Sequence, residues 1–341
     1  MKRWPLLGGV ALTAASLAGA AGGCRRATPS PAGGERDRVR VSYAPFVSYA
    51  PLFIAADAGF FRAHGLDVEL VRMPVYDSTA ALLHGDVDVA SNYLSIGALN
   101  AIAKGERLRI VADKGYEATG GCAANALFAR RALVTGGQLS GVASLRGRRV
   151  AVQSGTIEEF WFDRMLERAG VPRADVNVVT LLSEGRAAAL GTGAVDLVAW
   201  SEPFLSQAAA EGLGAVWKGA GEVIPDLQWA YVLYGRSLLD ARPDVGRRFT
   251  LAYLEGVRTY LEGKTEGNVA SIVRHTGLDP DVVRRGCWLA VRPDGRIDTA
   301  SVLDFERWAK LKGYLDAIVP EERFWDPSFV AWASLRLGGG R

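Results

Sequence analysis

A short motif that occurs twice is the feature that most constrains how this chain can fold. The first copy spans residues 81–90 (ALLHGDVDVA), and the second begins 108 positions later, at residues 189–199 (ALGTGAVDLVA). In each copy an Ala/Leu helix end is followed by glycine and then by Val-Asp and a small apolar strand. Glycine adopts a positive φ readily, so helix and strand can be joined with almost no loop. The repeat predicts two α/β lobes of similar design, with a cleft between them as the place for a functional site.

Composition supports two lobes and argues against one class of partner. The chain has 341 residues, of which 49% are hydrophobic, which is enough for two cores. The formal net charge is +3, and only +1 remains without Lys2 and Arg3, which belong to a segment that we expect to be removed. The sequence has no basic patch or arginine-rich arm, so nucleic acid is not an expected partner.

The N-terminus has the order of an export signal. Lys2 and Arg3 precede the apolar stretch 6–20, which is too short to span a bilayer, and small residues lead to Cys24. This order is typical of a bacterial lipoprotein signal, with residues 1–23 removed and Cys24 lipidated. Ala21 stands where that pattern prefers leucine, so a plain secretory signal is the alternative. Residues 24–38 are polar and rich in proline and glycine, which predicts a flexible tether.

Two further cysteines, Cys122 and Cys287, lie far apart in the sequence. In an oxidising compartment they can form a disulfide, provided that the fold brings them together. Two buried free thiols are the alternative.

The rest of the chain alternates between extended and helical patterns. Strands are expected at 39–43, 66–71, 87–90, 108–112, 149–152, 176–181 and 229–233. Helices are expected at 52–61, 78–85, 96–104, 157–169 and 204–211, with a helical C-terminal part from 243 onward. This alternation predicts βαβ units and mainly parallel sheets. We assign 39–117 to the first part of lobe one, 118–222 to lobe two, and 223–341 to a return strand and helices that pack mainly on lobe one.

Ligands of open parallel sheets bind just beyond the carboxyl ends of the strands, and this rule selects the candidate residues. In the first lobe the candidates are Phe46, Ser48, Tyr49, Ser78, Thr79, Ser91, Asn92 and Tyr93. In the second lobe they are Ser154, Gly155, Thr156, Trp200 and Glu202. Rings beyond strand ends can stack on a flat ligand, each contact contributing about 0.5–1.5 kcal/mol beyond burial. Core filling is the alternative role for these rings.

The loop Ser154-Gly155-Thr156 is the sharpest candidate for an anion site. Glycine allows close approach of the backbone, and the following helix directs free N–H groups and its positive end toward the cleft. A sulfonate, nitrate or carboxylate would be held there without a formal cation. Ordinary helix capping by Ser154 or Thr156 is the alternative. Ser78 and Thr79 offer the same chemistry from the first lobe, with the same alternative.

The order of several phrases resembles a known family. The phrases are 51–55 (PLFIA), 59–61 (GFF), 65–70 (GLDVEL), the repeat at Gly85, 144–152 (SLRGRRVAV) and 200–203 (WSEP). They are similar to periplasmic substrate-binding proteins of ABC importers, in the branch for nitrate, sulfonates, taurine and pyrimidine precursors of thiamine. The resemblance implies an α/β periplasmic-binding-protein fold of type 2, in which each of two lobes is a mainly parallel sheet flanked by helices.

The resemblance also implies a function and partners. It predicts an exported monomer that captures a small molecule by closing a hinge, with an ABC permease, an ATPase and the membrane, through Cys24, as partners. Phe46 and Tyr49 stand where the thiamine-precursor branch carries Asn and His, which favours small sulfonates and related anions. An aromatic heterocycle is the alternative ligand, and a sensory receptor without transport is an alternative role.

No catalytic motif stands out. His64, His84 and His275 lack the spacing of metal ligands, and the sequence contains no C-x-x-C, H-E-x-x-H or G-x-S-x-G. We therefore expect no catalytic residue, cofactor or metal. Because the same fold also carries enzymes, a small-molecule enzyme is the alternative.

Overall fold

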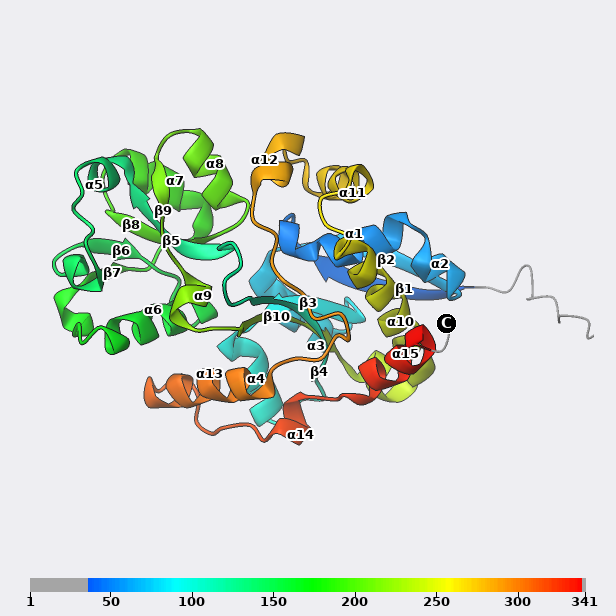
Figure 1. Ribbon diagram of the computed structural model, residues 1–341. Coiled ribbons are helices and arrows are strands. Elements are labelled where there is room, and N and C mark those ends of the chain that lie inside the picture. The colour runs from blue at the N-terminus through cyan, green and yellow to red at the C-terminus, as the bar shows by residue number, and fades with distance from the viewer. Residues whose placement is uncertain (1–35, 339–341) are drawn as a thin grey trace, which may run out of the picture. The chain divides into compact units, whose positions relative to one another are not determined.

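Two five-stranded sheets organise the computed structural model, which describes residues 36–338 (Figure 1). The first sheet has the order β2-β1-β3-β10-β4, formed by β1 (Asp37–Tyr43), β2 (Leu66–Arg72), β3 (Val89–Tyr93), β4 (Arg109–Glu117) and β10 (Leu227–Tyr234). The second has the order β7-β6-β8-β5-β9, formed by β5 (Asn125–Arg130), β6 (Arg149–Ala151), β7 (Asn177–Val179), β8 (Leu197–Ser201) and β9 (Gly214–Gly219). We call the parts built around these sheets the first and the second lobe.

Each sheet has four strands in one direction and one opposed strand. In the first sheet β1 pairs in parallel with β2 and β3, and β10 is antiparallel to its neighbours β3 and β4. In the second, β6 pairs in parallel with β7 and β8, and β5 is antiparallel to β8 and β9. The predicted α/β fold of two lobes with mainly parallel sheets is confirmed.

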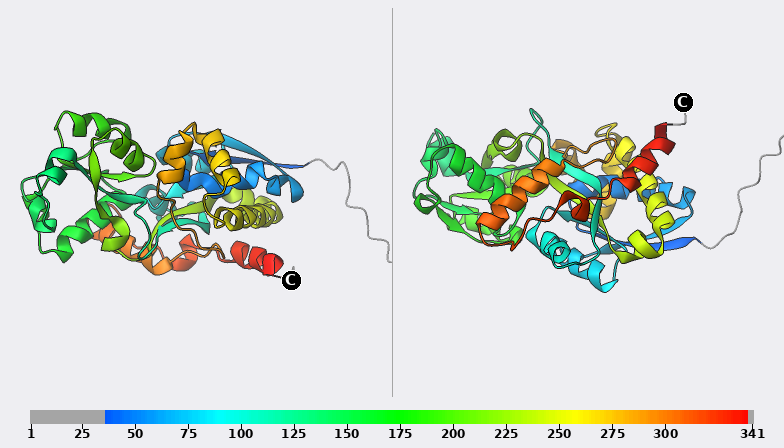
Figure 2. Two further views of the ribbon diagram at one scale, coloured as in Figure 1. Left: turned by 45° about the horizontal axis from the view of Figure 1, so that its top comes forward. Right: turned by 90° about the horizontal axis from the view of Figure 1, so that it is seen from below.

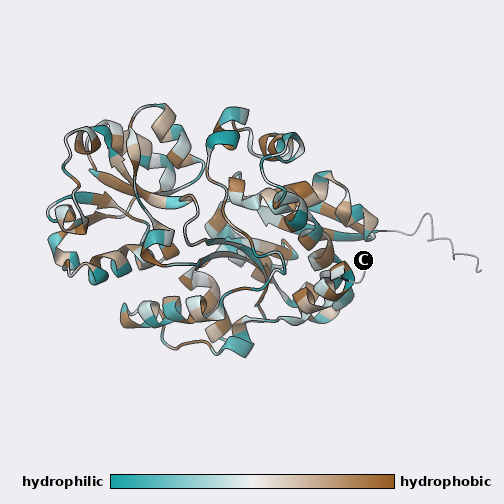
Figure 3. Cartoon of the chain, in the orientation of Figure 1, coloured by the Kyte–Doolittle hydropathy of each residue, from teal (hydrophilic) through white to brown (hydrophobic). Residues whose placement is uncertain are grey.

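The helices that flank these sheets alternate with the strands along most of the chain. They are α1 (Ala50–Asp57), α2 (Phe60–Ala63), α3 (Ser78–His84), α4 (Ile96–Ala103), α5 (Arg131–Thr135), α6 (Ile157–Arg168), α7 (Ser183–Gly191), α8 (Phe204–Ala210), α9 (Ala220–Val223), α10 (Pro243–Tyr260), α11 (Glu266–Thr276), α12 (Pro280–Arg285), α13 (Thr299–Leu311), α14 (Glu321–Phe324) and α15 (Ser328–Gly338). The helix expected at 52–61 is interrupted, because Gly59 has φ 79° and starts the separate helix α2. In Figure 3, apolar residues gather on the strands while the helices show both apolar and polar residues.

The repeated motif builds the same corner in both lobes. Gly85 and Gly193 have φ angles of 79° and 71°, as the joining role requires. The carboxylate of Asp88 accepts the backbone N–H of Arg40 in β1 at 2.9 Å. Asp196 accepts the backbone N–H of Arg149 in β6 at the same distance. The Val-Asp step that the two copies share therefore fixes the first strand of each lobe to the strand of the motif.

Two short segments connect the lobes. Residues 118–124 lead from β4 to β5, and residues 220–226, which include α9, lead back from β9 to β10. The backbone N–H of Thr119 donates to the carboxylate of Asp226 at 2.9 Å, so the two segments are bonded to each other. Each opposed strand, β5 or β10, is thus the first strand after a crossing.

The C-terminal helices pack on both lobes. Helix α10 packs on α1 and α15, beside the first sheet, whereas α13 lies along α6 of the second lobe (Figure 2). The ring of Phe160 in α6 makes edge contacts with Phe305 and Trp308 of α13, both with centroids 5.6 Å apart. The final third of the chain therefore braces the second lobe as well as the first.

A disulfide joins Cys122 of the first crossing segment to Cys287, with Cα atoms 5.7 Å apart. Of the two alternatives that the sequence left open, the structure shows the pair. Cys24 and the predicted signal segment lie outside the described residues. Among residues 36–338, no helix combines the length and the apolar composition needed to cross a membrane.

Candidate functional site

A cleft of about 840 Å³ lies between the lobes, at the carboxyl ends of the parallel strands. The first lobe lines it with the segments after β1 and β2, the end of β3, and Trp229 of β10. The second lobe lines it with the loop after β6, the start of α7, and the region from β8 to α8. A strand-like bridge between Ser95 and Thr156 brings the lobes into backbone contact at one side.

Aromatic rings make up much of the cleft wall. The lining rings are Phe46, Tyr76, Tyr93, Phe204 and Trp229. Phe46 stacks on Tyr93, with centroids 6.2 Å apart, and makes an edge contact with Phe204 of the second lobe at 5.8 Å. Because Phe46 touches a ring on each lobe, the wall is continuous across the boundary. Such a surface suits a planar, largely apolar molecule.

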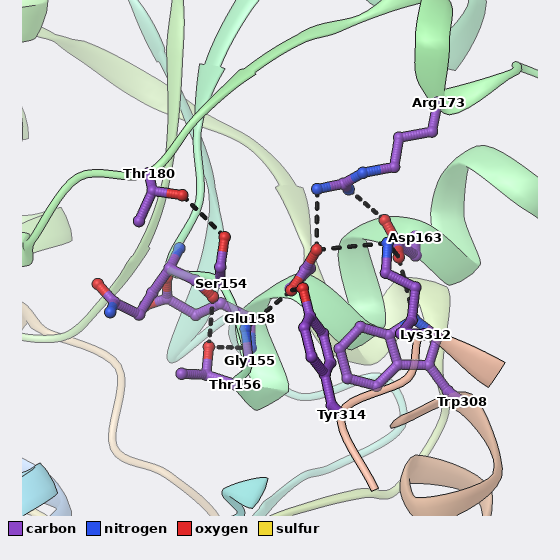
Figure 4. Close-up of polar contacts among 12 residues, drawn as sticks. Ser154, Gly155, Thr156, Glu158, Asp163, Arg173, Thr180, Trp308, Lys312 and Tyr314 are labelled. Carbon is purple, nitrogen blue, oxygen red and sulfur yellow. Dashed lines mark hydrogen bonds and ion pairs between the residues drawn. The ribbon is translucent and has the colours of Figure 1, made fainter. Parts of the chain in front are cut away.

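The loop after β6 already has acidic partners within the chain. The hydroxyl of Thr156 caps α6 by accepting the N–H of Glu158, so the capping alternative applies to this residue. The N–H of Gly155 donates to Glu159 at 2.8 Å, and the N–H of Gln153 donates to Glu158 at 3.1 Å. Two carboxylates therefore accept N–H groups of the loop that was expected to hold an anion. Ser154 lies outside the cleft lining, with its hydroxyl 2.8 Å from that of Thr180 (Figure 4).

A buried arginine neutralises the acidic residue that faces the cleft. Arg186 of α7 is 0% exposed and binds both carboxylate oxygens of Glu158, at 2.9 and 3.2 Å. It also donates to the carbonyl oxygens of Leu181 and Ala199. Of the remaining charged residues in the lining, Arg72 and Glu184 have opposite signs and are exposed. The lining is therefore close to neutral.

The predicted site residues separate into a group in the lining and a group behind it. Phe46, Tyr93 and Thr156 line the cleft. Ser48 and Glu202 line a small cavity of about 10 Å³ that shares Tyr93, Ser201 and Trp229 with the cleft. The residues outside both linings are Tyr49, Ser78, Thr79, Ser91, Asn92, Ser154, Gly155 and Trp200.

Most residues of the second group have structural partners. The Tyr49 hydroxyl donates to the carbonyl of Ser91 at 2.9 Å. The Asn92 amide donates to the Thr79 hydroxyl at 2.9 Å, and the Ser78 hydroxyl donates to the carbonyl of Val75. Trp200, in turn, stacks on Phe204 with centroids 5.3 Å apart, within the core of the second lobe. These residues hold the lining in place.

Sequence reasoning missed a lysine directly behind the cleft wall. Lys114 is 1% exposed, and its Nζ has no hydrogen-bond partner. That atom lies 3.7 Å from the ring centre of Tyr49 and 4.5 Å from that of Tyr93. Burial lowers the pKa of the amine well below its usual value. A polar residue inside the strand pattern of β4 was the signal that could have found it.

Ion pairs and hydrogen bonds connect the loop after β6 and the start of α6 to the C-terminal segment that follows α13. Besides Gly155, the carboxylate of Glu159 accepts the Tyr314 hydroxyl at 3.1 Å and pairs with Arg173 at 2.9 Å. Lys312 lies 3.4 Å from Glu159 and 3.1 Å from Asp163. Figure 4 shows these side chains converging beside α6 from the second lobe and from the end of α13. Movement of the loop after β6 must therefore be accompanied by the C-terminal segment, or break these contacts.

One buried carboxyl lies where the first crossing begins. Glu117, the last residue of β4, accepts the side-chain amide of Asn125, the first residue of β5. Burial raises the pKa of Glu117 to about 7, against hydrogen bonds from Ala124 and Asn125 that favour the ionised form. Its direct partners are uncharged.

We predict that this carboxyl makes stability fall as the pH rises. Because the folded-state pKa is raised, the native protein binds the extra proton between about pH 4.5 and pH 7, and this contribution is lost above that window. The free energy of unfolding of Glu117→Gln minus that of the parent should therefore be about 3 kcal/mol larger at pH 7 than at pH 4.5. Urea unfolding of both proteins across the window measures the difference. A difference that does not change with pH would contradict the prediction.

Comparison with known proteins adds to this geometry. Residues 32–274 match the NMT1-like family. The chain belongs to the NMT1-like family. Its sequence has no significant match among curated proteins.

Solved structures share the fold of this NMT1-like chain at low sequence identity. The ligand-binding component of an ABC-type import system from Staphylococcus aureus has a TM-score of 0.73 and 17% identity, over 87% of this chain and 99% of that one. The periplasmic aliphatic sulphonate-binding protein SsuA from Escherichia coli has 0.70 and 19%, over 85% and 97%. The periplasmic nitrate-binding protein NrtA from Synechocystis has 0.72 and 16%, over 89% of each chain. The desulfurization enzyme DSZB also shares the fold, with 0.63 and 17%, over 89% and 100%.

Proposed function

We propose that the protein is the extracytoplasmic solute-binding component of an ABC importer. The observation that carries this proposal is the cleft of about 840 Å³, lined by residues of both lobes. A ligand that contacts residues of both lobes stabilises the closed arrangement, because it binds this arrangement more tightly than the open one. The fold shared with import-system binding proteins supports the same function. Delivery to a permease driven by an ATPase completes the proposed role.

For the contact residues we propose the part of the predicted set that lies in the two linings. They are Phe46, Ser48, Tyr93, Thr156 and Glu202, joined by Phe204 and Trp229. The aromatic wall supports a small organic molecule with a planar body. A bare anion such as nitrate is the poorer fit, because Glu158 and Glu159 already accept the N–H groups of Gln153 and Gly155 in the loop before α6. An acceptor-rich anion such as a sulfonate is the second candidate, with Arg72 as its cation.

We propose binding without chemical change, although DSZB shows that the fold also carries an enzyme. The lining of the large cleft, as far as the described residues go, contains neither cysteine nor histidine, the usual nucleophile and base. The small cavity behind it includes Cys287, whose sulfur is bonded to Cys122. This composition supports a binding role.

We propose that the protein acts outside the cytoplasm, attached through a lipid at Cys24. The signal-like order of residues 1–23 supports export. The disulfide between Cys122 and Cys287 supports an oxidising compartment, since such bonds rarely persist in the cytosol. A mass for the membrane-extracted protein that matches diacylglyceryl-Cys24 tests the anchor.

Native mass spectrometry of the protein purified from its source tests the function. We expect a retained small molecule that is released unchanged on denaturation. Adding that compound at about 100 times its Kd should stabilise the protein by about 2.7 kcal/mol. Conversion of the compound during incubation, or the absence of stabilisation, would refute a binding role.

We predict that Phe46→Ala weakens binding of the retained compound by about tenfold, because it removes a stacked ring and its edge contact across the lobes. Isothermal titration measures the change. Leu311→Ala is the control, since Leu311 is 85% exposed at the end of α13 and outside the cleft lining. Equal affinities for the two variants would mean that Phe46 does not face the ligand.

A further inference from the structure

We propose that Ser201 presents only hydrogen-bond acceptor lone pairs to the ligand, so that the cleft selects molecules with an N–H or O–H donor at this point. The inference deepens the proposed function and rests on it. It names a feature of the ligand, which is an amine, amide or hydroxyl group carried on a planar body.

Ser201 stands where the cleft meets the crossing between the lobes. It is the last residue of β8 and lines both the cleft and the small cavity behind it. Asn125 lies directly opposite Ser201 in the pairing of β5 with β8, and only 2% of its surface is exposed. The Ser201 hydroxyl donates to the side-chain oxygen of Asn125.

The direction of this hydrogen bond is set by Glu117. Above its pKa of about 7 the Glu117 carboxyl is ionised and can only accept, so the Asn125 amide must turn its NH₂ group toward Glu117 and its oxygen toward Ser201. A serine hydroxyl has one proton, and Asn125 Oδ1 receives it. What remains on Ser201 Oγ for the cleft is a lone pair. Glu117 therefore acts as a positioning residue, through Asn125.

Neighbouring polar groups do not compensate. The Glu202 oxygens are taken by the hydroxyl and N–H of Ser206 and by the N–H of Cys287. Ser48 is engaged with the Tyr93 hydroxyl at 3.2 Å. A ligand group against Ser201 must then supply the proton itself, because an acceptor placed there leaves two lone pairs facing each other. A nitrate ion and the sulfonate group itself offer acceptors only.

Neutron diffraction from the perdeuterated, ligand-free protein tests the direction of the hydroxyl. The crystal is kept above about pD 8, where Glu117, with its pKa of about 7, is ionised. We expect the deuterium of Ser201 on the line to Asn125 Oδ1, and both amide deuteriums of Asn125 on the side away from Ser201. Deuterium of Ser201 directed into the cleft, or a reversed amide, overturns the inference.

Binding of defined probes gives a second readout. Benzamide offers N–H donors, N,N-dimethylbenzamide lacks them, and methanesulfonate is an acceptor-only anion. We expect benzamide to bind at least about tenfold more tightly than the other two, and Ser201→Ala to remove most of that preference. The control is Ser140→Ala, which should leave the preference unchanged, because Ser140 is exposed and lies outside both linings.

The outcomes separate the two proposals. Preference for methanesulfonate, or a benzamide preference that Ser201→Ala leaves intact, overturns the role of Ser201. If none of the probes binds, the neutron positions alone decide it. Turnover of the compound retained by the purified protein would instead overturn the binding function, and would leave the direction of the hydroxyl unaffected.

Discussion

Arg186→Ala should lower the free energy of unfolding by about 3–5 kcal/mol, the cost of leaving a buried charge without its partner. Arg186 is fully buried, and Glu158 loses two hydrogen bonds when the guanidinium is removed. The carbonyl oxygens of Leu181 and Ala199 lose a donor as well. Urea unfolding followed by circular dichroism measures the change.

Two further variants make this prediction specific. Arg146→Ala breaks an ion pair with Asp175 in which both side chains are more than 40% exposed, and should cost less than about 1 kcal/mol. Combining Arg186→Met with Glu158→Gln removes both charges and should recover part of the loss. A cost below about 1 kcal/mol for Arg186→Ala would show that the pair does not hold α6 and α7 together.

Breaking the disulfide should have the second large effect. Cys122 and Cys287 are 165 positions apart, and in the chain-entropy description closing such a long loop stabilises the folded state by about 5 kcal/mol. We expect the Cys122→Ser, Cys287→Ser double variant to lose most of that amount in urea unfolding. The parent protein in a reducing agent should show a similar loss.

The double variant also provides the control. Its stability should not respond to the reducing agent, because Cys122 and Cys287 are the cysteines of the described region. Thiol labelling of the unfolded, unreduced parent should find neither of the two free. Labelling of both would show that the bond is not formed in the protein.

The sequence predicted the two lobes because each repeated motif is one continuous segment of the chain. Each repeated motif places a glycine with positive φ between a helix and a strand, and the following aspartate is bonded to the first strand of its own lobe. The rule for carboxyl ends of strands also found Phe46, Tyr93 and Thr156, which line the cleft.

The same rule could not tell lining residues from their supports. Tyr49 and Trp200 also follow strand ends, yet both are buried behind the wall. The direction in which a ring turns depends on its neighbours, which are Lys114 and Ser91 for Tyr49 and Phe128 for Trp200. These neighbours come from other segments of the chain, so the spacing of residues around Tyr49 and Trp200 does not predict the contacts.

The sequence by itself determined the two α/β lobes, their order along the chain and the edge of each sheet that faces the cleft, since periodicity and glycine positions act within a few residues. Only the tertiary structure decided the polarity of the cleft. The partners Glu158 and Arg186, or Glu117, Asn125 and Ser201, are separated in the chain and meet only when strands and helices pack. Burial then fixes which way each hydrogen bond points, because an unpaired polar group costs most where water is excluded.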